Sequence, residues 1–182
     1  MADRGLTGVL LVGGASRRFG SPKALAQLDG ETLAERGWRV LGGACEERIA
    51  VGKEADALPL PFPVLDDGAE VRAPIAGVVA GLRAASHDVC VFLPVDCPLI
   101  PSHSLLRLAA EAPAAPPTGP LPGAYPKALL PLLAEKLARG DYSLRDVPVT
   151  VVELDPRELA NVNTSAELAA LQPRSSGSTA LP

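Results

Sequence analysis

The chain has 182 residues, which is the size of one ordinary domain with room for a substantial hydrophobic core. Apolar residues make up 47% of the chain but aromatic residues only 3%, so leucine, valine and alanine must build that core. The net charge of −4 and the lack of a lysine- and arginine-rich cluster argue against a nucleic-acid partner, whereas a single nucleotide needs only a few donors.

No segment of the sequence has the pattern of a membrane span or a secretion signal. The residues before Leu6 lack the long apolar stretch of a signal peptide, and no apolar run approaches the roughly 18 residues of a membrane span. The three cysteines (Cys45, Cys90 and Cys97) are an odd number without CxxC spacing, which predicts no disulfide framework. We therefore expect a cytoplasmic protein with neither a membrane nor a nucleic acid as its partner.

The N-terminal half of the chain alternates between expected strands and an expected helix. Apolar runs bounded by turn residues predict strands at 6–12, 48–51 and 64–67. Thr32 and Glu35 have the spacing of a capping box ahead of an apolar periodic segment. That spacing predicts a helix from about residue 33 to 42.

The second half continues the alternation. Pro74 fits the first turn of a helix through Leu82, and the apolar run 88–95 is typical of a central parallel strand. Further helices are expected at 102–111 and 127–138, a late strand at 150–154, and a last helix behind the capping box of Thr164 and Glu167. The five prolines of 112–123 argue against a central strand there, because each removes a backbone donor.

This order of elements predicts an α/β fold in three layers, α/β/α, with a mostly parallel central sheet. Residues 1–171 are expected to form a single domain. The segment 172–182 is rich in serine, glycine and proline and is expected to be a disordered tail.

The loop after the first strand carries the clearest chemical signal. The strand stops at Gly13–Gly14, so the backbone can turn sharply and bring bare N–H groups against an anion. Arg17, Arg18 and Lys23 add three cations, enough to balance much of a triphosphate. The spacing fits neither the Walker P-loop nor the dinucleotide-binding GxGxxG motif. We interpret the segment as a phosphate-binding loop rather than a solvated basic loop.

A carboxylate follows the most apolar strand. Asp96 should project from the carboxyl end of a central strand, which is where open α/β sheets place their ligands. A hard oxygen ligand at that point suits Mg²⁺, which takes one or two carboxylates together with phosphate oxygens. The alternative is an aspartate that only caps the following turn. Cys97 is expected to be a small packing residue, since no histidine lies nearby in the sequence.

Residues 13–23 resemble the G-G-x-S-x-R-[MF]-G-x-x-K signature of the molybdenum cofactor nucleotidyltransferases, and the guanylyltransferase branch of that family is the most similar. The similarity continues through 72–77, 93–101, 120–125 and 161–164. It implies the Rossmann-like fold of the nucleotide-diphospho-sugar transferases. It further implies an Mg²⁺-dependent enzyme that transfers GMP from GTP to the terminal phosphate of molybdopterin (the molybdenum cofactor), releases pyrophosphate, and contacts molybdoenzyme-maturation proteins.

The resemblance also assigns roles to residues. Arg18, Lys23 and Asp96 match catalytic positions, and Asp96 matches the position that holds Mg²⁺. The implied nucleotide-binding positions are Leu11, Val12, Gly13, Gly14, Arg18, Lys23, Asp66, Pro74, Gly77 and Asp96. Asn161 and Asn163 match the acceptor side, and two amides that flank one extended residue should point the same way.

The choice of base depends on two segments, 11–14 and 73–77, which both resemble those of the guanylyltransferases. At Gly13 the cytidylyltransferase relatives carry alanine, whereas a glycine leaves room for a purine edge. Three positions depart from the family: Gly52 stands where guanylyltransferases place a base-contacting asparagine, Ala15 replaces a frequently basic residue, and Ala73 replaces a glycine. A cytidylyl or sugar-phosphate nucleotidyltransferase on the same scaffold, and a nucleotide-binding protein without catalysis, are the alternatives.

Overall fold

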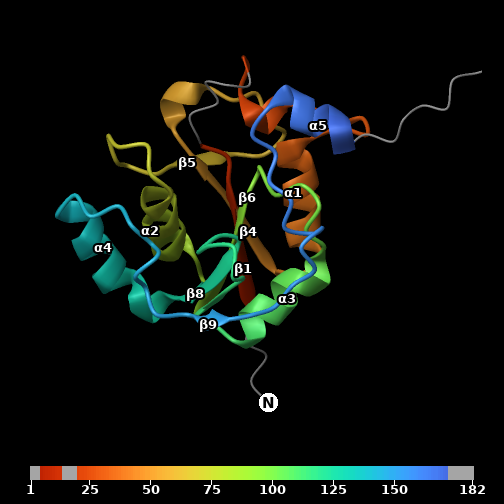
Figure 1. The fold of residues 1–182 in the computed structure, drawn as a ribbon. Coiled ribbons are helices and arrows are strands. Elements are labelled where there is room, and N and C mark those ends of the chain that lie inside the picture. The colour runs from red at the N-terminus through yellow and green to blue at the C-terminus, as the bar shows by residue number, and fades with distance from the viewer. Residues whose placement is uncertain (1–4, 14–19, 172–182) are drawn as a thin grey trace, which may run out of the picture.

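The computed structural model describes residues 5–13 and 20–171, and their centre is a seven-stranded sheet in the order β5-β4-β1-β6-β8-β7-β9 (Figure 1). The strands are β1 (Leu6–Leu11), β4 (Glu47–Gly52), β5 (Val64–Asp66), β6 (Val89–Pro94), β7 (Ala114–Ala115), β8 (Gly123–Pro126) and β9 (Thr150–Val151). All neighbouring strands run parallel except β8, which is antiparallel to both β6 and β7. The mostly parallel sheet predicted from the sequence is thus confirmed.

Five helices and a few shorter elements complete the described chain. The helices are α1 (Leu33–Gly42), α2 (Pro74–Ala84), α3 (Ser102–Ala110), α4 (Leu130–Ala138) and α5 (Ser165–Leu171). Short 3-10 turns lie at Lys23–Leu25, Glu54–Asp56 and Lys127–Leu129, and a small hairpin joins β2 (Gln27–Leu28) to β3 (Glu31–Thr32). None of the helices in the described ranges is both long and apolar enough to cross a membrane.

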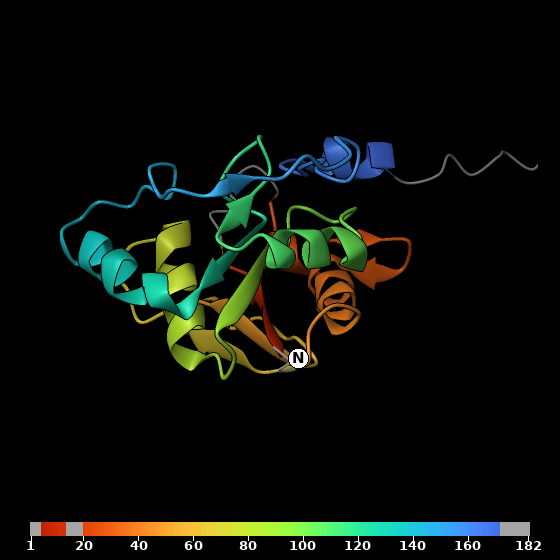
Figure 2. The same cartoon turned by 90° about the horizontal axis from the view of Figure 1, so that it is seen from below.

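The helices cover the sheet on both sides, which gives the predicted three layers. Figures 1 and 2 show α2 and α4 on one face and α1, α3 and α5 on the other. Alternate side chains of β1 serve the two layers: Leu10 belongs to the core cluster under α1 and α3, whereas Val9 and Leu11 belong to the cluster under α2 and α4. Val9 and Leu10 are fully buried, as expected for a strand covered on both faces.

Both predicted capping boxes are present. The backbone N–H of Glu35 donates to Thr32 Oγ1 (3.1 Å) and the N–H of Thr32 donates back to Glu35 Oε2 (3.1 Å), so α1 starts where the sequence predicts. At α5, Glu167 N–H donates to Thr164 Oγ1 (3.1 Å), and the Glu167 carboxylate accepts from the N–H of Thr164 (3.2 Å).

The proline-rich segment 112–123 corrects a prediction. The two-residue strand β7 lies inside the sheet, between β8 and β9, although prolines surround it. The prolines flank this strand, and Pro113 contributes only an acceptor: its carbonyl accepts from Thr150 N–H (2.8 Å), while the carbonyl of Ala115 within the strand accepts from Val152 N–H (3.0 Å). The strand β8 was not predicted, and β9 is shorter than the expected 150–154.

Candidate active site at the carboxyl edge of the sheet

A cavity of about 590 Å³ opens where the parallel strands β1, β4, β5 and β6 end. Its wall contains the residue that follows each of these strands or lies close behind it: Gly13, Lys53, Asp67 and Asp96. The strands β4 and β5 lie on one side of β1, and β6, which comes later in the chain, lies on the other side. The order of strands therefore reverses between β1 and β6. Ligands of open α/β sheets bind at such a reversal.

Three segments that are far apart in the sequence meet on one side of this cavity. Lys23 Nζ donates to Asn163 Oδ1 at 3.1 Å and lies 3.5 Å from Asp96 Oδ2. The side chains of Lys23 and Asp96 are 17% and 31% exposed, so both can still reach a ligand. Among the positions predicted for catalysis, these two therefore lie together with an acceptor-side amide, and Asp96 brings the group to the wall of the cavity.

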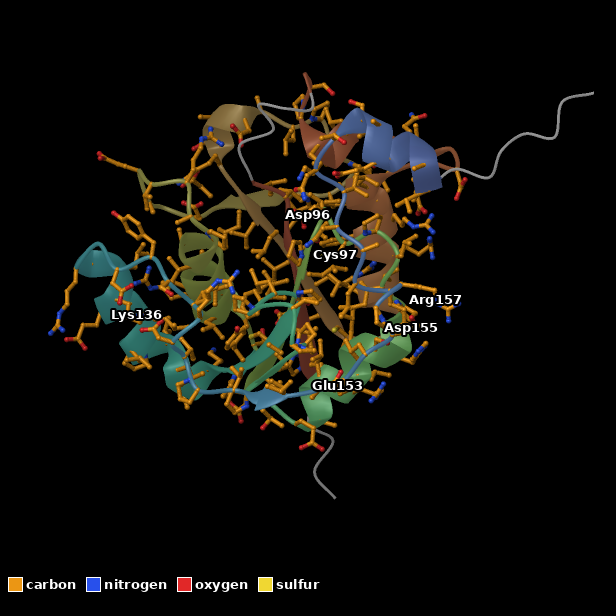
Figure 3. The ribbon with its side chains drawn as sticks, viewed as in Figure 1. Asp96, Cys97, Lys136, Glu153, Asp155 and Arg157 are labelled. Carbon is orange, nitrogen blue, oxygen red and sulfur yellow. The ribbon has the colours of Figure 1, made fainter. Side chains whose placement is uncertain are left out.

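The second amide is next to this cluster. Asn161 lines the cavity and its Oδ1 accepts from the Cys97 thiol at 3.0 Å, while the N–H of the buried Val162 donates to the Asp96 carbonyl at 2.8 Å. Asn161 and Asn163 thus flank a buried residue; Asn161 lines the cavity, and Asn163 bonds to Lys23 beside it. Figure 3 shows Asp96 and Cys97 together beyond the end of β6. Burial, and then the negative charge of Asp96, raises the pKa of the Cys97 thiol, which fits a packing residue.

Asp67 and Lys53 form an ion pair on the opposite side of the cavity. Lys53 Nζ lies 2.6 Å from Asp67 Oδ1 and also donates to the carbonyl of Ala69, and the two side chains are only 10% and 9% exposed. The sequence pattern alone does not mark Lys53 as a site residue. Its place directly after a strand that ends at the ligand edge was the signal that could have identified it.

Asp66, one of the nucleotide-binding positions that the resemblance implies, does not line the cavity. Its carboxylate accepts from the backbone N–H groups of Glu54 and Gly68, each at 2.7 Å, and these bonds lower its pKa. The neighbouring Asp67 enters the cavity instead. The physical reason is the alternation of side chains along extended backbone, which turns adjacent residues to opposite sides.

The remaining predicted nucleotide positions divide into three groups. Leu11, Gly13, Pro74 and Gly77 line the cavity. Val12 does not, because its side chain is buried in the core. Gly14 and Arg18 lie outside the described residues, as does Arg17.

Two loops that were given no role in the sequence analysis close the cavity from the other side. Residues 118–121 follow β7, and residues 142–145 follow α4, and both contribute to the wall. Among them, Arg145 adds a cation and Thr118 and Ser143 add hydroxyl groups. Arg72, also in the wall, is held by a bidentate ion pair with Asp56 (2.6 and 3.0 Å). These residues lie on loops whose paths the sequence pattern does not define.

The carboxylates of the described residues bear on the question of a metal. Within 5–13 and 20–171, no three histidine, cysteine, aspartate or glutamate side chains gather closely enough to enclose a metal ion. Asp96 offers one accessible carboxylate beside a cavity large enough for a phosphorylated ligand. That donor set suits an ion such as Mg²⁺, which is usually held by one or two carboxylates together with phosphate oxygens and water.

The fold and the site define a class: α/β proteins with a large cavity at the carboxyl edge of a mostly parallel sheet, where the order of strands reverses. Residues 8–151 match the family model described as the MobA-like NTP transferase domain, and the chain belongs to this family. A molybdenum cofactor guanylyltransferase from Burkholderia vietnamiensis is 34% identical over 197 residues, covering 93% of this chain and 96% of the relative.

Solved structures support the same fold. The molybdopterin-guanine dinucleotide biosynthesis protein A of Archaeoglobus fulgidus superposes with a TM-score of 0.74 at 22% identity, over 90% of this chain and 95% of that one. The 2-C-methyl-D-erythritol 4-phosphate cytidylyltransferase of Thermus thermophilus gives 0.69, also at 22% identity, over 90% and 95%. Because proteins with different bases in their names share the fold, the fold alone does not define the base.

Proposed function

We propose that this protein transfers the guanylyl group of GTP to the terminal phosphate of molybdopterin, in the cytoplasm and with Mg²⁺. The observation that carries the proposal is the contact of Lys23 with both Asn163 and Asp96, because Asp96 lines the cavity at the reversal of strand order. The name of the relative that is 34% identical over nearly the whole chain supports the base and the acceptor.

The reaction requires positioning and charge neutralisation more than acid–base chemistry. An oxygen of the acceptor phosphate attacks the α-phosphorus of GTP, a new P–O bond forms, and the bond to the bridging oxygen breaks, so that pyrophosphate leaves with the electron pair. The attacking phosphate is already anionic near pH 7, so no general base is needed. Neither histidine of the chain, His87 or His103, lines the cavity.

Each residue of the cluster has a part in this scheme. The Lys23 ammonium stabilises negative charge on the phosphates as it develops. Asn161 and Asn163 orient the acceptor, and the main-chain groups from Gly13 onward, together with Arg18, bind the triphosphate. Asp96 would hold Mg²⁺, which supplies further neutralisation of the phosphate charge when bound.

The test is release of pyrophosphate from GTP, CTP and ATP, each with and without molybdopterin. We expect turnover with GTP that depends on molybdopterin and Mg²⁺, and loss of that turnover in Asp96→Asn. Arg157→Gln, which changes an exposed side chain outside the cavity wall, is the control and should behave as the wild type. Preference for CTP, or full activity of Asp96→Asn at ordinary Mg²⁺ concentrations, would contradict the proposal.

A further inference from the structure

An arginine outside the cavity contacts both of the segments that carry Lys23 and Asp96. Lys23 starts a 3-10 turn that leads into the hairpin of β2 and β3, whereas Asp96 lies in the turn behind β6. Arg36, on α1, contacts the hairpin and the turn behind β6 at the same time. It does not line the cavity, and the transfer scheme leaves it without a role.

The guanidinium of Arg36 lies between these two segments. Its Nε donates to the carbonyl of Pro98 at 2.8 Å, and its Nη1 lies 4.0 Å from Asp29 Oδ2 and 3.9 Å from Glu31 Oε2. The side chain is 23% exposed, so most of it is enclosed by the chain. A planar guanidinium donates along more than one edge, so this single group holds the hairpin and the turn at a fixed distance from each other.

The hairpin transmits its position to Lys23. Asp29 and Gly30 form its two-residue turn, with positive φ at both residues (53° and 81°), which matches the twist of the paired strands. The N–H of Leu33 donates to the Ala26 carbonyl at 2.8 Å, and the N–H of Ala26 donates to the Lys23 carbonyl at 3.1 Å. Two main-chain hydrogen bonds therefore lead from the start of α1 to Lys23, and a shift of the hairpin would move the backbone of this lysine.

The carbonyl of Pro98 holds the turn that carries Asp96. Pro98 is a buried residue, and just before it the N–H of Cys97 donates to the Pro94 carbonyl at 3.2 Å. A carbonyl inside a protein that loses its donor is unfavourable, and the chain moves until another donor or water reaches it. Loss of Arg36 should therefore shift this turn and the Asp96 carboxylate with it.

We propose that Arg36 is a positioning residue: by joining the hairpin to the turn behind β6, it sets the separation of the Lys23 ammonium from the Asp96 carboxylate, which is 3.5 Å. This inference rests on the proposed function, because it assumes that these two groups act on the transferred phosphate. A displacement of about 1 Å can cost about 100-fold in rate, since such groups act only when they are preorganised. The binding of GTP also depends on cavity residues that Arg36 does not contact, so kcat should change more than KM.

Arg39 provides a matched control on the same helix. It donates to both carboxylate oxygens of Glu31, at 3.0 and 2.9 Å, and its side chain is 61% exposed. Arg36 and Arg39 thus share this carboxylate, but the Pro98 carbonyl accepts from Arg36. Arg36→Met and Arg39→Met therefore remove the same charge from the same helix and differ in the contact with the turn behind β6.

The first test measures kcat and the KM for GTP by pyrophosphate release with molybdopterin, together with thermal unfolding of each variant. In Arg36→Met we expect kcat to fall about 10- to 100-fold and KM to stay within about 2-fold, whereas Arg39→Met should keep the wild-type kcat. Arg36→Lys should recover part of the lost rate, because an ammonium can still donate to the Pro98 carbonyl. Equal kcat in Arg36→Met and Arg39→Met would overturn the proposal.

A double-mutant cycle with Lys23→Ala distinguishes positioning from general support of the fold. If Arg36 acts through Lys23, Arg36→Met has less to disturb once Lys23 is gone, and the factor by which it lowers kcat should be at least about threefold smaller in that background. The same factor in both backgrounds would assign Arg36 a purely structural role and overturn the proposal. Should Arg36→Met fail to fold, the cycle is made with Arg36→Lys, whose loss of rate should likewise be smaller beside Lys23→Ala.

The outcomes separate this inference from the proposed function. Turnover of GTP with molybdopterin in the wild type, combined with full activity of Arg36→Met, overturns the role of Arg36 and leaves guanylyl transfer intact. Transfer from another nucleoside triphosphate or to another acceptor overturns the proposed function, and the comparison of Arg36→Met with Arg39→Met on that reaction still decides the role of Arg36. A wild-type protein that releases pyrophosphate from no nucleoside triphosphate overturns both.

Discussion

Replacing Lys23 by alanine should slow the transfer reaction strongly. The ammonium of Lys23 lies 3.1 Å from Asn163 Oδ1 and 3.5 Å from Asp96 Oδ2, between an amide of the acceptor side and the carboxylate proposed for the metal. A cation held at this point needs little reorganisation when charge develops on the phosphates. Removing one preorganised donor of this kind lowers kcat by about 10²- to 10³-fold, and we expect a loss of that size.

The same substitution should hardly affect stability. The side chains of Lys23 and Asp96 are 17% and 31% exposed, so solvent screens their interaction. Partly exposed pairs of this kind contribute about 0–1 kcal/mol. For a chain of this length, 1 kcal/mol corresponds to a change in Tm of about 2–4 °C. A 100-fold loss of rate in Lys23→Ala could then not be attributed to unfolding.

The measurement is steady-state pyrophosphate release from GTP with molybdopterin, together with thermal unfolding of each variant. Arg139→Ala is the matched control, because it also removes one positive charge, from an exposed side chain at the end of α4 that pairs with Glu135. This control should keep the wild-type kcat. If Lys23→Ala keeps more than about a tenth of the wild-type kcat, the argument that Lys23 stabilises charge in the transition state is refuted.

Three further predictions concern stability. Thr32→Ala removes the capping box of α1 and should lower the free energy of unfolding by about 1 kcal/mol, measured by urea denaturation, whereas Thr32→Ser should restore most of it. Leu10→Ala, in the fully buried core beneath α1, should lower the free energy of unfolding by about 2–5 kcal/mol. Leu106→Ala, at an exposed position, should lower it by less than about 0.5 kcal/mol, and similar losses for both variants would refute the assignment of the core. The hydrogen bonds of Arg72 hold the pKa of Asp56 below its usual value. Their contribution to the stability of the fold is therefore complete above about pH 4 and is lost as the pH falls through the pKa of Asp56 in the folded state. The free energy of unfolding of Arg72→Met, measured by denaturation, should therefore be lower than that of the wild type at pH 7, and the difference should shrink below pH 4. A difference that does not depend on pH would contradict this cause.

Local patterns predicted most of the fold because the physics that fixes these elements is local. The capping boxes of Thr32 and Thr164 satisfy backbone donors within one turn, so four residues of sequence locate the start of each of α1 and α5. The apolar run that became β6 is too hydrophobic for any place but the centre of a covered sheet. Asp96 followed from that strand, since the carboxyl ends of parallel strands share one edge.

The elements that escaped prediction depend on partners distant in the sequence. β7 is only two residues long and exists because β8 and β9 lie on either side of it, which no propensity of Ala114 and Ala115 could indicate. The choice between Asp66 and Asp67 depends on the register of β5 beside β4, where a shift by one residue exchanges the two sides. The ion pair of Lys53 with Asp67 likewise required knowing that β4 and β5 are neighbours.

The two sides of the proposed reaction are coupled through the backbone as well as through the Lys23 side chain. The carbonyl of Asp96 accepts from the N–H of Val162 at 2.8 Å, and Val162 is anchored in the core with about 1% of its surface exposed. Because Asn161 and Asn163 flank this anchor, their distance from the Asp96 carboxylate is set by one main-chain hydrogen bond and one buried side chain. A loop of otherwise irregular structure can therefore present its amides at a reproducible distance from the proposed metal, as an in-line transfer between two phosphates requires.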